Sequence, residues 1–210
     1  MGKGSVTRDR ILEIAEAAVL AKGFGATSIE EIIAEAGITK SGFFYHFKDK
    51  SELARGLVER YSDQNDRLLD DVFGRARALT DDPLEQLLIG LTLMADRMAA
   101  LPEGHPGCLV ASMSYQDRLF DREVRDLVTK VVEDWNAFFR KMIEKIVAVY
   151  PTREAVDPDQ LARTICCSID GGIIMSKALG QPKVLPEQML MARSYIKLLF
   201  SPVVAVRAAA

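Results

Sequence analysis

The chain has 210 residues, of which 49% are apolar and 27% charged, which is enough apolar material for one or two globular domains. Its net charge of −3 gives no overall basic field, so any anion-binding surface must arise from local placement of lysines and arginines. No run of about 18 apolar residues is present, which argues against a spanning helix and a membrane partner. The opening MGKGSVTRDR lacks the apolar stretch of a signal peptide, so we expect a cytoplasmic location.

Cysteine and histidine are scarce: Cys108, Cys166 and Cys167, with His46 and His105, make up the whole set. An odd number of cysteines without an export signal favours reduced thiols, and no spacing resembles a zinc site. We therefore expect no metal, no cofactor and no histidine-based catalytic centre. Adjacent thiols on a helix point about 100° apart, so Cys166 and Cys167 are expected to be buried thiols, with redox sensing as the alternative.

Helical periodicity runs through nearly the whole chain, and no segment shows a convincing strand alternation. A first helix is expected over residues 7–22, ended by Gly23. The second begins at Ser28, which stands three residues before Glu31 in the spacing of a capping box, and ends at Gly37. Its apolar positions repeat at i, i+3, i+4 and i+7, as Ile29, Ile32, Ile33 and Ala36.

A short helix is expected over about 40–46, directly after the Gly37 turn, and a long one from about Asp49 to Leu79. Prolines and glycines separate the remaining helical segments. These are expected over residues 83–101, 107–119, 122–149, 157–179 and 186–200. The sequence therefore predicts an all-α chain of roughly nine helices.

Residues 28–47 combine a helix, a glycine turn and a short helix, the arrangement in which a second helix can enter a DNA major groove. Helical hairpins of this spacing are common, so the pattern alone is weak evidence. The accompanying side chains strengthen it, because hydroxyls and lysines that can bind phosphate stand at the helix starts and just after the short helix. They are Ser28, Thr39, Lys40, Ser41, Lys48 and Lys50.

This region resembles, without gaps, the DNA-binding domain of the TetR family of bacterial transcriptional regulators. The matching segments are Thr7–Ala21, KGFGATSIEEIIAEAG and ITKSGFFYHFKDKSEL, whose aromatic-His-Phe-x-x-Lys pattern is the specific part. The resemblance implies a three-helix helix-turn-helix DNA-binding domain over residues 1–55, and a larger helical ligand-binding and dimerisation domain over 56–210. It also implies that Lys40, Ser41 and Gly42 face base edges, while Ser28, Phe44, Tyr45, His46 and Lys50 lie at the DNA backbone.

Two positions depart from the family pattern. Phe44 stands where the family usually has tyrosine, so a phosphate-bonding hydroxyl is missing; Tyr45 can supply one instead, or Phe44 can contact a thymine methyl. Ile33 replaces a small alanine, and its bulk is expected to tilt the recognition helix.

Each residue of the motif also has a plainer interpretation. Phe43 and Phe47 are i, i+4 partners and are expected to be core residues. Tyr45 can be an ordinary surface aromatic, His46 an internal cap, and the lysines solvated charges. Because all of them fit one gap-free pattern, we favour DNA contacts for Tyr45, His46 and the lysines.

The C-terminal part raises the question of dimerisation. The segment LARTICCSIDGGIIMSKAL places Gly171 and Gly172 inside a helix, where each costs about 1 kcal/mol relative to alanine. Close approach of a second helix would explain them, and a kink is the alternative. With the last helix this segment can form a four-helix contact across a two-fold axis, so we predict a homodimer through residues 158–200.

Soft and aromatic side chains of the same part suggest a pocket for a small, mainly apolar molecule, although core packing explains any single one of them. The candidates are Met94, Met98, Met113, Trp135, Phe138, Phe139, Met142 and Met175, with Tyr115, Gln116 and Asp170 as possible polar anchors.

The interpretation that these features favour is a ligand-controlled transcriptional regulator, most simply a repressor that leaves its double-stranded operator when a small molecule binds. The alternative is a small all-α ligand-binding protein or enzyme whose helix-turn-helix is incidental. Because no nucleophile–base pair or metal cluster is evident in the sequence, we expect no enzymatic activity.

Overall fold

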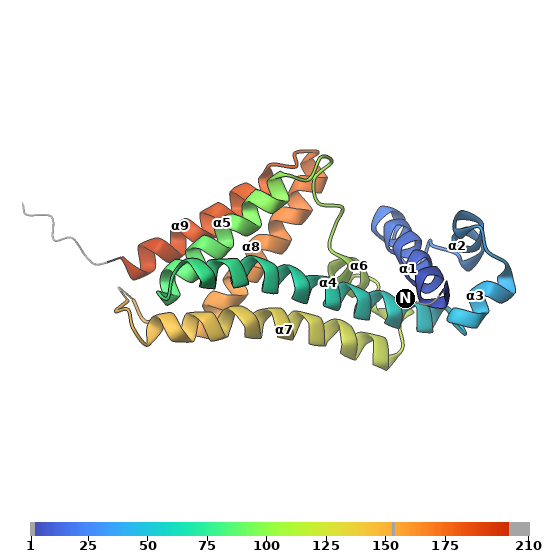
Figure 1. Cartoon of the computed structure of the whole chain (residues 1–210), viewed down its shortest axis with the longest axis horizontal. Coiled ribbons are helices and arrows are strands. Elements are labelled where there is room, and N and C mark those ends of the chain that lie inside the picture. Colours follow the sequence, from blue (N-terminus) through green and yellow to red (C-terminus); the bar gives the residue numbers. More distant parts are fainter. Residues whose placement is uncertain (1–2, 153, 202–210) are drawn as a thin grey trace, which may run out of the picture. The chain divides into compact units, whose positions relative to one another are not determined.

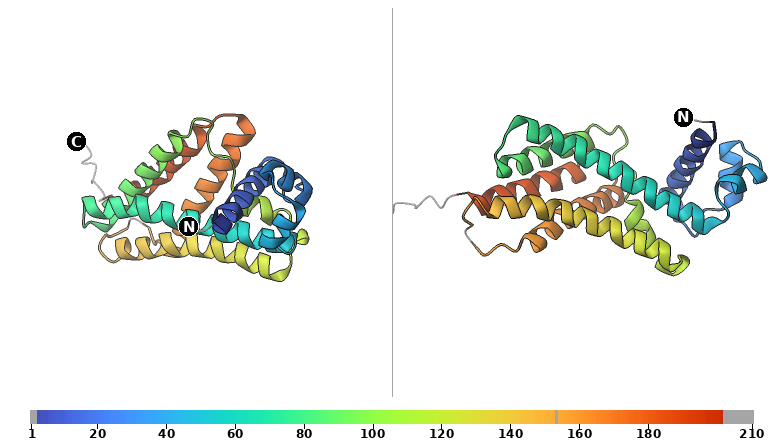
Figure 2. Two further views of the ribbon diagram at one scale, coloured as in Figure 1. Left: turned by 45° about the vertical axis from the view of Figure 1, so that its right-hand side comes forward. Right: turned by 60° about the horizontal axis from the view of Figure 1, so that its bottom comes forward.

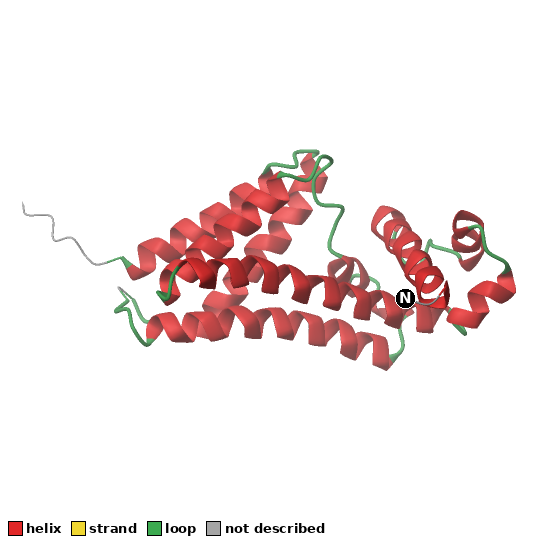
Figure 3. Ribbon diagram, in the orientation of Figure 1, coloured by secondary structure: helices red, strands yellow, loops and turns green. Residues whose placement is uncertain are grey.

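The computed structural model describes residues 3–152 and 154–201, and within them it contains nine α-helices, one short 3₁₀ helix and no strand (Figure 3). The all-α prediction is confirmed. The helices, labelled in Figure 1, are α1 (Lys3–Lys22), α2 (Ile29–Ala36), α3 (Lys40–His46), α4 (Lys50–Leu79), α5 (Pro83–Ala99), α6 (Leu109–Ser114), the 3₁₀ helix η1 (Asp117–Leu119), α7 (Arg122–Val147), α8 (Pro158–Leu179) and α9 (Val184–Phe200).

The described residues divide into two compact units. The first holds the residues up to Leu68 together with Pro106–Glu133, and the second holds Leu69–His105 and the residues from Asp134 onward. Helices α4 and α7 each contribute one part to both units. The domain boundary after residue 55, which the family resemblance implies, remains a prediction.

The core of the first unit is built from α1, α2, α3, the start of α4, and α6, with α1 packing against both α2 and α6. Its fully buried side chains include Ile11, Leu12, Ile32, Phe43, Phe47, Leu53 and Leu57. Of the apolar stripe predicted for α2, Ile32 and Ala36 are buried and Ile29 and Ile33 half-buried. Burial of such side chains holds α2 and α3 in place, since helices of seven or eight residues are marginal alone.

The segment expected as one helix over 107–119 is instead two short pieces, and that prediction is wrong. Gly107 has φ +136°, and Cys108 serves as the N-cap of α6, accepting a hydrogen bond from the Ala111 amide at 3.4 Å. After Tyr115 the chain turns into η1, because contacts of Gln116 and Phe120 with the α1–α2 turn draw it away from the helix axis.

In the second unit α9 packs against both α5 and α8, and Figure 2 shows the three helices side by side (green, orange and red). Gly172 of α8 explains one of the two mid-helix glycines, because a Cβ there would lie 3.2 Å from the Leu185 Cα of α9. Gly171 has no such neighbour, since among the described residues no atom beyond the local backbone of α8 lies within 4 Å of the position of its Cβ. Only Gly172 is thus accounted for by packing within the chain.

Candidate nucleic-acid interface

The helix-turn-helix begins with a capped α2. The Ser28 hydroxyl accepts a hydrogen bond from the Glu31 amide at 3.2 Å, as the capping-box spacing predicts. At the other end Gly37 adopts a left-handed conformation (φ 62°), and its N–H reaches the carbonyls of Ala34 and Ile33. This C-cap terminates α2 and lets the chain reverse within three residues toward α3.

Helix α3 starts at Thr39, whose hydroxyl accepts from the Gly42 amide at 3.1 Å and lies 3.0 Å from the Ser41 hydroxyl. A Cβ on Gly42 would lie 3.3 Å from Thr39 Oγ1, so the missing side chain leaves room for this cap. Thr39, Ser41 and Gly42 therefore form one compact start to the helix.

The side chains of α3 divide into a buried and an exposed face. Phe43 and Phe47 are fully buried, as predicted, and fix the helix to the core. The opposite stripe is exposed: Lys40, Ser41, Phe44 and Tyr45, with Tyr45 82% accessible. The i, i+4 pairs Lys40/Phe44 and Ser41/Tyr45 thus expose an ammonium group, a serine hydroxyl and two aromatic rings side by side on one face of α3.

Phe44 and His46 stand at the edges of this stripe. The Phe44 ring is 39% exposed, meets the edge of Phe43 with centroids 5.4 Å apart, and lies 6.0 Å from the Lys40 Nζ. His46 is half-buried and packs edge-on against the Tyr45 ring at 4.9 Å. Phe44 therefore offers an apolar surface where a hydroxyl was expected, next to the phenol of Tyr45.

Lys50 differs from the other lysines of the motif. Its Nζ donates a hydrogen bond to the Phe24 carbonyl at 2.8 Å and lies 4.7 Å above the centre of the Phe24 ring. Partial burial lowers the pKa of Lys50 from its usual value. The structure thus gives this ammonium a partner within the protein.

Local charge favours α3 over α2 as the anion-facing helix. Helix α3 contains no acidic residue, whereas α2 carries Glu30, Glu31 and Glu35. The Lys22 ammonium lies 2.5 Å from Glu31, and its hydrogen bond lowers the pKa of that carboxyl group. The local distribution of charged residues, and not the net charge of the chain, therefore makes α3 suitable for binding near DNA phosphates.

Sequence reasoning named Gln116 only as a possible ligand anchor. In the structure its side-chain Oε1 accepts a hydrogen bond from the Gly25 amide at 2.9 Å, across 91 positions of sequence. No local pattern signals a contact of this separation, so only the tertiary fold reveals it.

Among the predicted ligand-binding residues, three aromatic rings of α7 lie together in the second unit. Phe138 and Phe139 pack against Phe73 with centroids 5.0 and 5.8 Å apart, and Trp135 lies 6.3 Å from Phe139. Among the described residues, the Trp135 Nε1 and the Asn136 Oδ1 are buried without a hydrogen-bond partner. The aromatic cluster therefore contains one buried donor, the Trp135 Nε1, that a bound molecule could satisfy.

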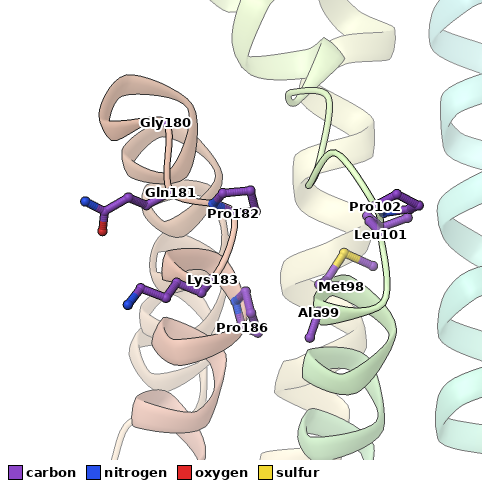
Figure 4. A pocket seen from close by; sticks show the side chains of 9 residues that line it. All are labelled: Met98, Ala99, Leu101, Pro102, Gly180, Gln181, Pro182, Lys183 and Pro186. Carbon is purple, nitrogen blue, oxygen red and sulfur yellow. The ribbon is translucent and has the colours of Figure 1, made fainter.

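The other members of the predicted ligand set are dispersed. Met94 is fully buried and Met142 half-buried. Met98 borders a pocket of about 480 Å³ that lies between the C-terminal end of α5 and the α8–α9 turn. Pro186 lies on the opposite side of this pocket (Figure 4). Met113 lines a separate cavity of about 250 Å³ in the first unit. Tyr115, Asp170 and Met175 lie on the surface.

The prediction of two buried thiols is wrong for Cys167, which is exposed because it lies on the outward face of α8 with Gly171 and Ile174. Cys166 is half-buried, and burial raises the pKa of its thiol to about 12, which keeps it protonated and unreactive.

Among the residues that the structure describes, no group of three or more His, Cys, Asp or Glu side chains is placed to hold a metal ion. None of the helices in the described ranges is both long and apolar enough to cross a bilayer.

Two family models match the chain. The model described as "Bacterial regulatory proteins, tetR family" covers residues 11–57, and "Tetracyclin repressor-like, C-terminal domain" covers residues 83–190. The first coincides with the helix-turn-helix and its flanking helices, and the second extends over half of the chain.

Curated relatives have matching descriptions. The transcriptional regulator AcuR of Cereibacter sphaeroides is 26% identical over 164 residues, which cover 78% of this chain and 73% of AcuR. The transcriptional repressor KstR2 of Mycolicibacterium smegmatis is 27% identical over 164 residues, covering 75% and 73% of the two chains.

Solved structures show the same fold. A TetR-family regulator from Agrobacterium tumefaciens superposes with a TM-score of 0.76 at 18% identity, over 95% of this chain and all of the other. A TetR regulator from Chloroflexus aurantiacus gives 0.76 at 23% identity, over 95% and 98% of the two chains. Reduced NemR of E. coli gives 0.75 at 16% identity, over 95% and 99%.

Proposed function

The chain belongs to the TetR family of bacterial regulatory proteins, and we propose that it acts as a repressor that a small, mainly apolar molecule releases from its operator. The observation that carries the proposal is the exposed stripe of α3, which is held by Phe43 and Phe47 behind it. Exposed aromatic side chains indicate an interaction surface, and the basic group beside them attracts an anionic partner. A helix that presents both while its other face is buried can enter a DNA groove. We propose a cytoplasmic location, because a bacterial regulator of this family must reach its operator DNA.

Residues of this stripe divide by the chemistry they offer to DNA. Lys40 and Ser41 can donate to base edges in the major groove, and Gly42 allows the backbone to approach. Phe44 supplies an apolar surface that suits a thymine methyl. Ser28, Thr39, Tyr45 and His46 carry hydroxyl and imidazole groups that suit phosphate oxygens at the edges of the groove. For Lys50 the hydrogen bond to Phe24 supports a positioning role in addition to any phosphate contact.

We propose a homodimer through α8 and α9. The outward faces of these helices carry large apolar side chains that the chain leaves exposed: Ile174, Met175, Leu179, Leu190, Met191, Tyr195 and Leu198. A face of this kind marks an interface, and Gly171 with its open surroundings allows a second helix to come close. A two-fold dimer would present two α3 helices to half-sites about 34–36 Å apart.

For the effector site, the aromatic cluster of the second unit supports a molecule with an apolar body. The unsatisfied Trp135 Nε1 requires an acceptor, so we propose that the effector also carries a hydroxyl or an amide. Differential binding worth about 1–3 kcal/mol would change operator affinity by about 5–150-fold.

Selection of duplexes from a random library by the full-length protein tests the DNA-binding proposal. A selected palindromic site, bound with an affinity that falls steeply with salt, is the expected result. Recovery of no duplex above background would rule out operator binding. Because Trp135 is the only tryptophan, its fluorescence reports on the effector site directly. Medium-chain alcohols should quench it at lower concentration than alkanes of equal length, and equal responses would contradict the polar anchor.

A further inference from the structure

The turn between α1 and α2 is held by a segment that lies about ninety residues away in sequence. The Gly25 amide donates to Gln116 Oε1 at 2.9 Å, and the rings of Phe24 and Phe120 pack with centroids 4.7 Å apart. Both rings are almost completely buried. The turn is therefore fixed at two points by residues 116–120, which we call the 116–120 clamp.

Glycines make this close approach possible. A Cβ on Gly23 would lie 2.5 Å from the Gln116 Nε2, and a Cβ on Gly25 would lie 3.0 Å from the Leu119 Cδ1. A Cβ at either position would require the side chain of Gln116 or Leu119 to shift. The Gln116 side-chain amide thus packs directly against the backbone of the turn, because Gly23 and Gly25 have no side chains.

The same turn leads directly into the start of α2. Thr27 is buried, and its hydroxyl donates to the Gly23 carbonyl at 2.9 Å, while the next residue, Ser28, is the N-cap of α2. Phe24 also accepts the hydrogen bond from Lys50 at the start of α4. A contact that orders Gly25 therefore orders the N-terminus of α2, where DNA backbone is expected to meet Ser28.

A further link joins the clamp region to α4. The Arg55 guanidinium lies 3.2 Å from the Asp121 carboxylate and 3.0 Å from that of Glu123. These ion pairs are partly exposed and contribute little by themselves. They nevertheless show that the chain following the clamp lies beside the start of α4, so the Gln116 contact is one of several between this segment and the helix-turn-helix.

We propose that Gln116 is a positioning residue of the DNA-binding site, which pre-organises the α1–α2 turn and with it the DNA-facing end of α2. The inference rests on the proposed DNA-binding function. A turn that is ordered before binding costs less conformational entropy when DNA binds. One side-chain hydrogen bond has a modest net effect, so its loss should weaken DNA binding about threefold to tenfold.

The test compares the full-length wild type with Gln116→Met, Gln116→Glu and Ser114→Ala. Methionine keeps the length but removes the acceptor, and glutamate keeps the acceptor. Ser114 is an exposed residue close to Gln116 whose hydroxyl bonds the Val110 carbonyl within α6. Three quantities are measured: exchange of the Gly25 amide proton in ¹⁵N-glycine-labelled protein, the melting temperature, and the Kd for the duplex that the wild type selects.

With Gln116→Met we expect faster Gly25 exchange and a Kd raised about threefold to tenfold, with the melting temperature lowered by less than about 3 °C. Gln116→Glu should restore the protection of Gly25 and most of the affinity, and Ser114→Ala should match the wild type. A side chain that only stabilises the fold would lower the melting temperature and leave the Kd of the folded protein unchanged.

The proposal is overturned if the Gly25 amide proton exchanges faster in Gln116→Met while the Kd for the selected duplex stays within about twofold of the wild-type value. It is equally overturned if Gly25 exchange does not change, since the contact then orders nothing. If the wild type itself selects no duplex, the proposed function has failed instead, and the Gly25 measurement still decides whether Gln116 holds the turn.

Discussion

The Lys50 ammonium donates a hydrogen bond to the Phe24 carbonyl at 2.8 Å and lies over the ring of the same residue. It thereby ties the first turn of α4 to the α1–α2 turn within the DNA-binding unit. The family pattern implies a lysine at the DNA backbone in this position. In this chain the Lys50 ammonium contacts Phe24 instead. A structural role and a phosphate contact are distinguishable by experiment, because they affect stability and salt dependence differently.

Replacing Lys50 by methionine should destabilise the protein by about 1–2 kcal/mol, because a hydrogen bond and a cation–π contact are lost together. DNA affinity should fall for all sequences alike, while the slope of log K against log salt stays unchanged. A slope reduced by about one unit would instead show that Lys50 neutralises a phosphate. Urea denaturation and binding titrations at several salt concentrations give both quantities.

Lys40 should behave in the opposite way. It opens α3 on the exposed stripe, and substitution by glutamine removes a donor to base edges without removing any core contact. We expect unchanged stability and a changed base preference at one position of the half-site, worth about 1–3 kcal/mol. Repeating the duplex selection with the variant checks this. A uniform loss of affinity with the same consensus would assign Lys40 to the DNA backbone.

The exposed face of α8 and α9 predicts the effect of a charge on oligomeric state. Ile174→Lys places an ammonium where a partner helix is expected, and should weaken the dimer about 100-fold or more. Val149→Lys, at a residue that is also exposed but lies outside α8 and α9, is the matched control. Sedimentation at several concentrations measures the change. Equal association of both variants would place the interface elsewhere.

The neighbouring glycines of α8 should respond differently to alanine. Gly172→Ala brings a Cβ within 3.2 Å of the Leu185 Cα, and overpacking should outweigh the gain in helix propensity, giving a net loss of about 1 kcal/mol. Within the described part of the chain, a Cβ at Gly171 meets no atom beyond the local backbone of α8, so Gly171→Ala should leave the monomer as stable or more stable and weaken only the dimer. Unfolding and association, measured separately, distinguish the two. Matching losses of stability would mean that Gly171 is also packed within the chain.

His105 predicts a dependence of stability on pH. Burial lowers the pKa of this imidazole below its usual value near 6.5, so the folded state favours the neutral form. The unfolded chain therefore binds more protons between the two pKa values, and stability falls as the pH decreases through this window. In His105→Gln the pH dependence of the unfolding free energy below about pH 6.5 should be smaller than in the wild type. An identical profile would show that other groups cause the acid sensitivity.

The amino-acid sequence by itself determined the helical architecture and the start of the DNA-binding unit. Helix boundaries depend on local rules: Ser28 caps α2 as predicted, Thr39 at the predicted start of α3 is found to cap that helix, and Gly37 ends α2 in a left-handed conformation. The burial of Phe43 and Phe47 likewise follows from their i, i+4 spacing. These features involve residues within about one helical turn of each other, so the sequence pattern is sufficient to predict them.

What only the tertiary structure decided depends on contacts between distant residues. Gln116 reaches Gly25, Lys50 reaches Phe24, and Gly172 admits Leu185, while the outward face of α8 exposes Cys167, which had been predicted to be buried. The single helix expected over 107–119 was interrupted for the same reason, because contacts with the α1–α2 turn competed successfully with local helix propensity. Periodicity reports which face of a helix is apolar, but the neighbour that covers that face is set by packing of the whole chain.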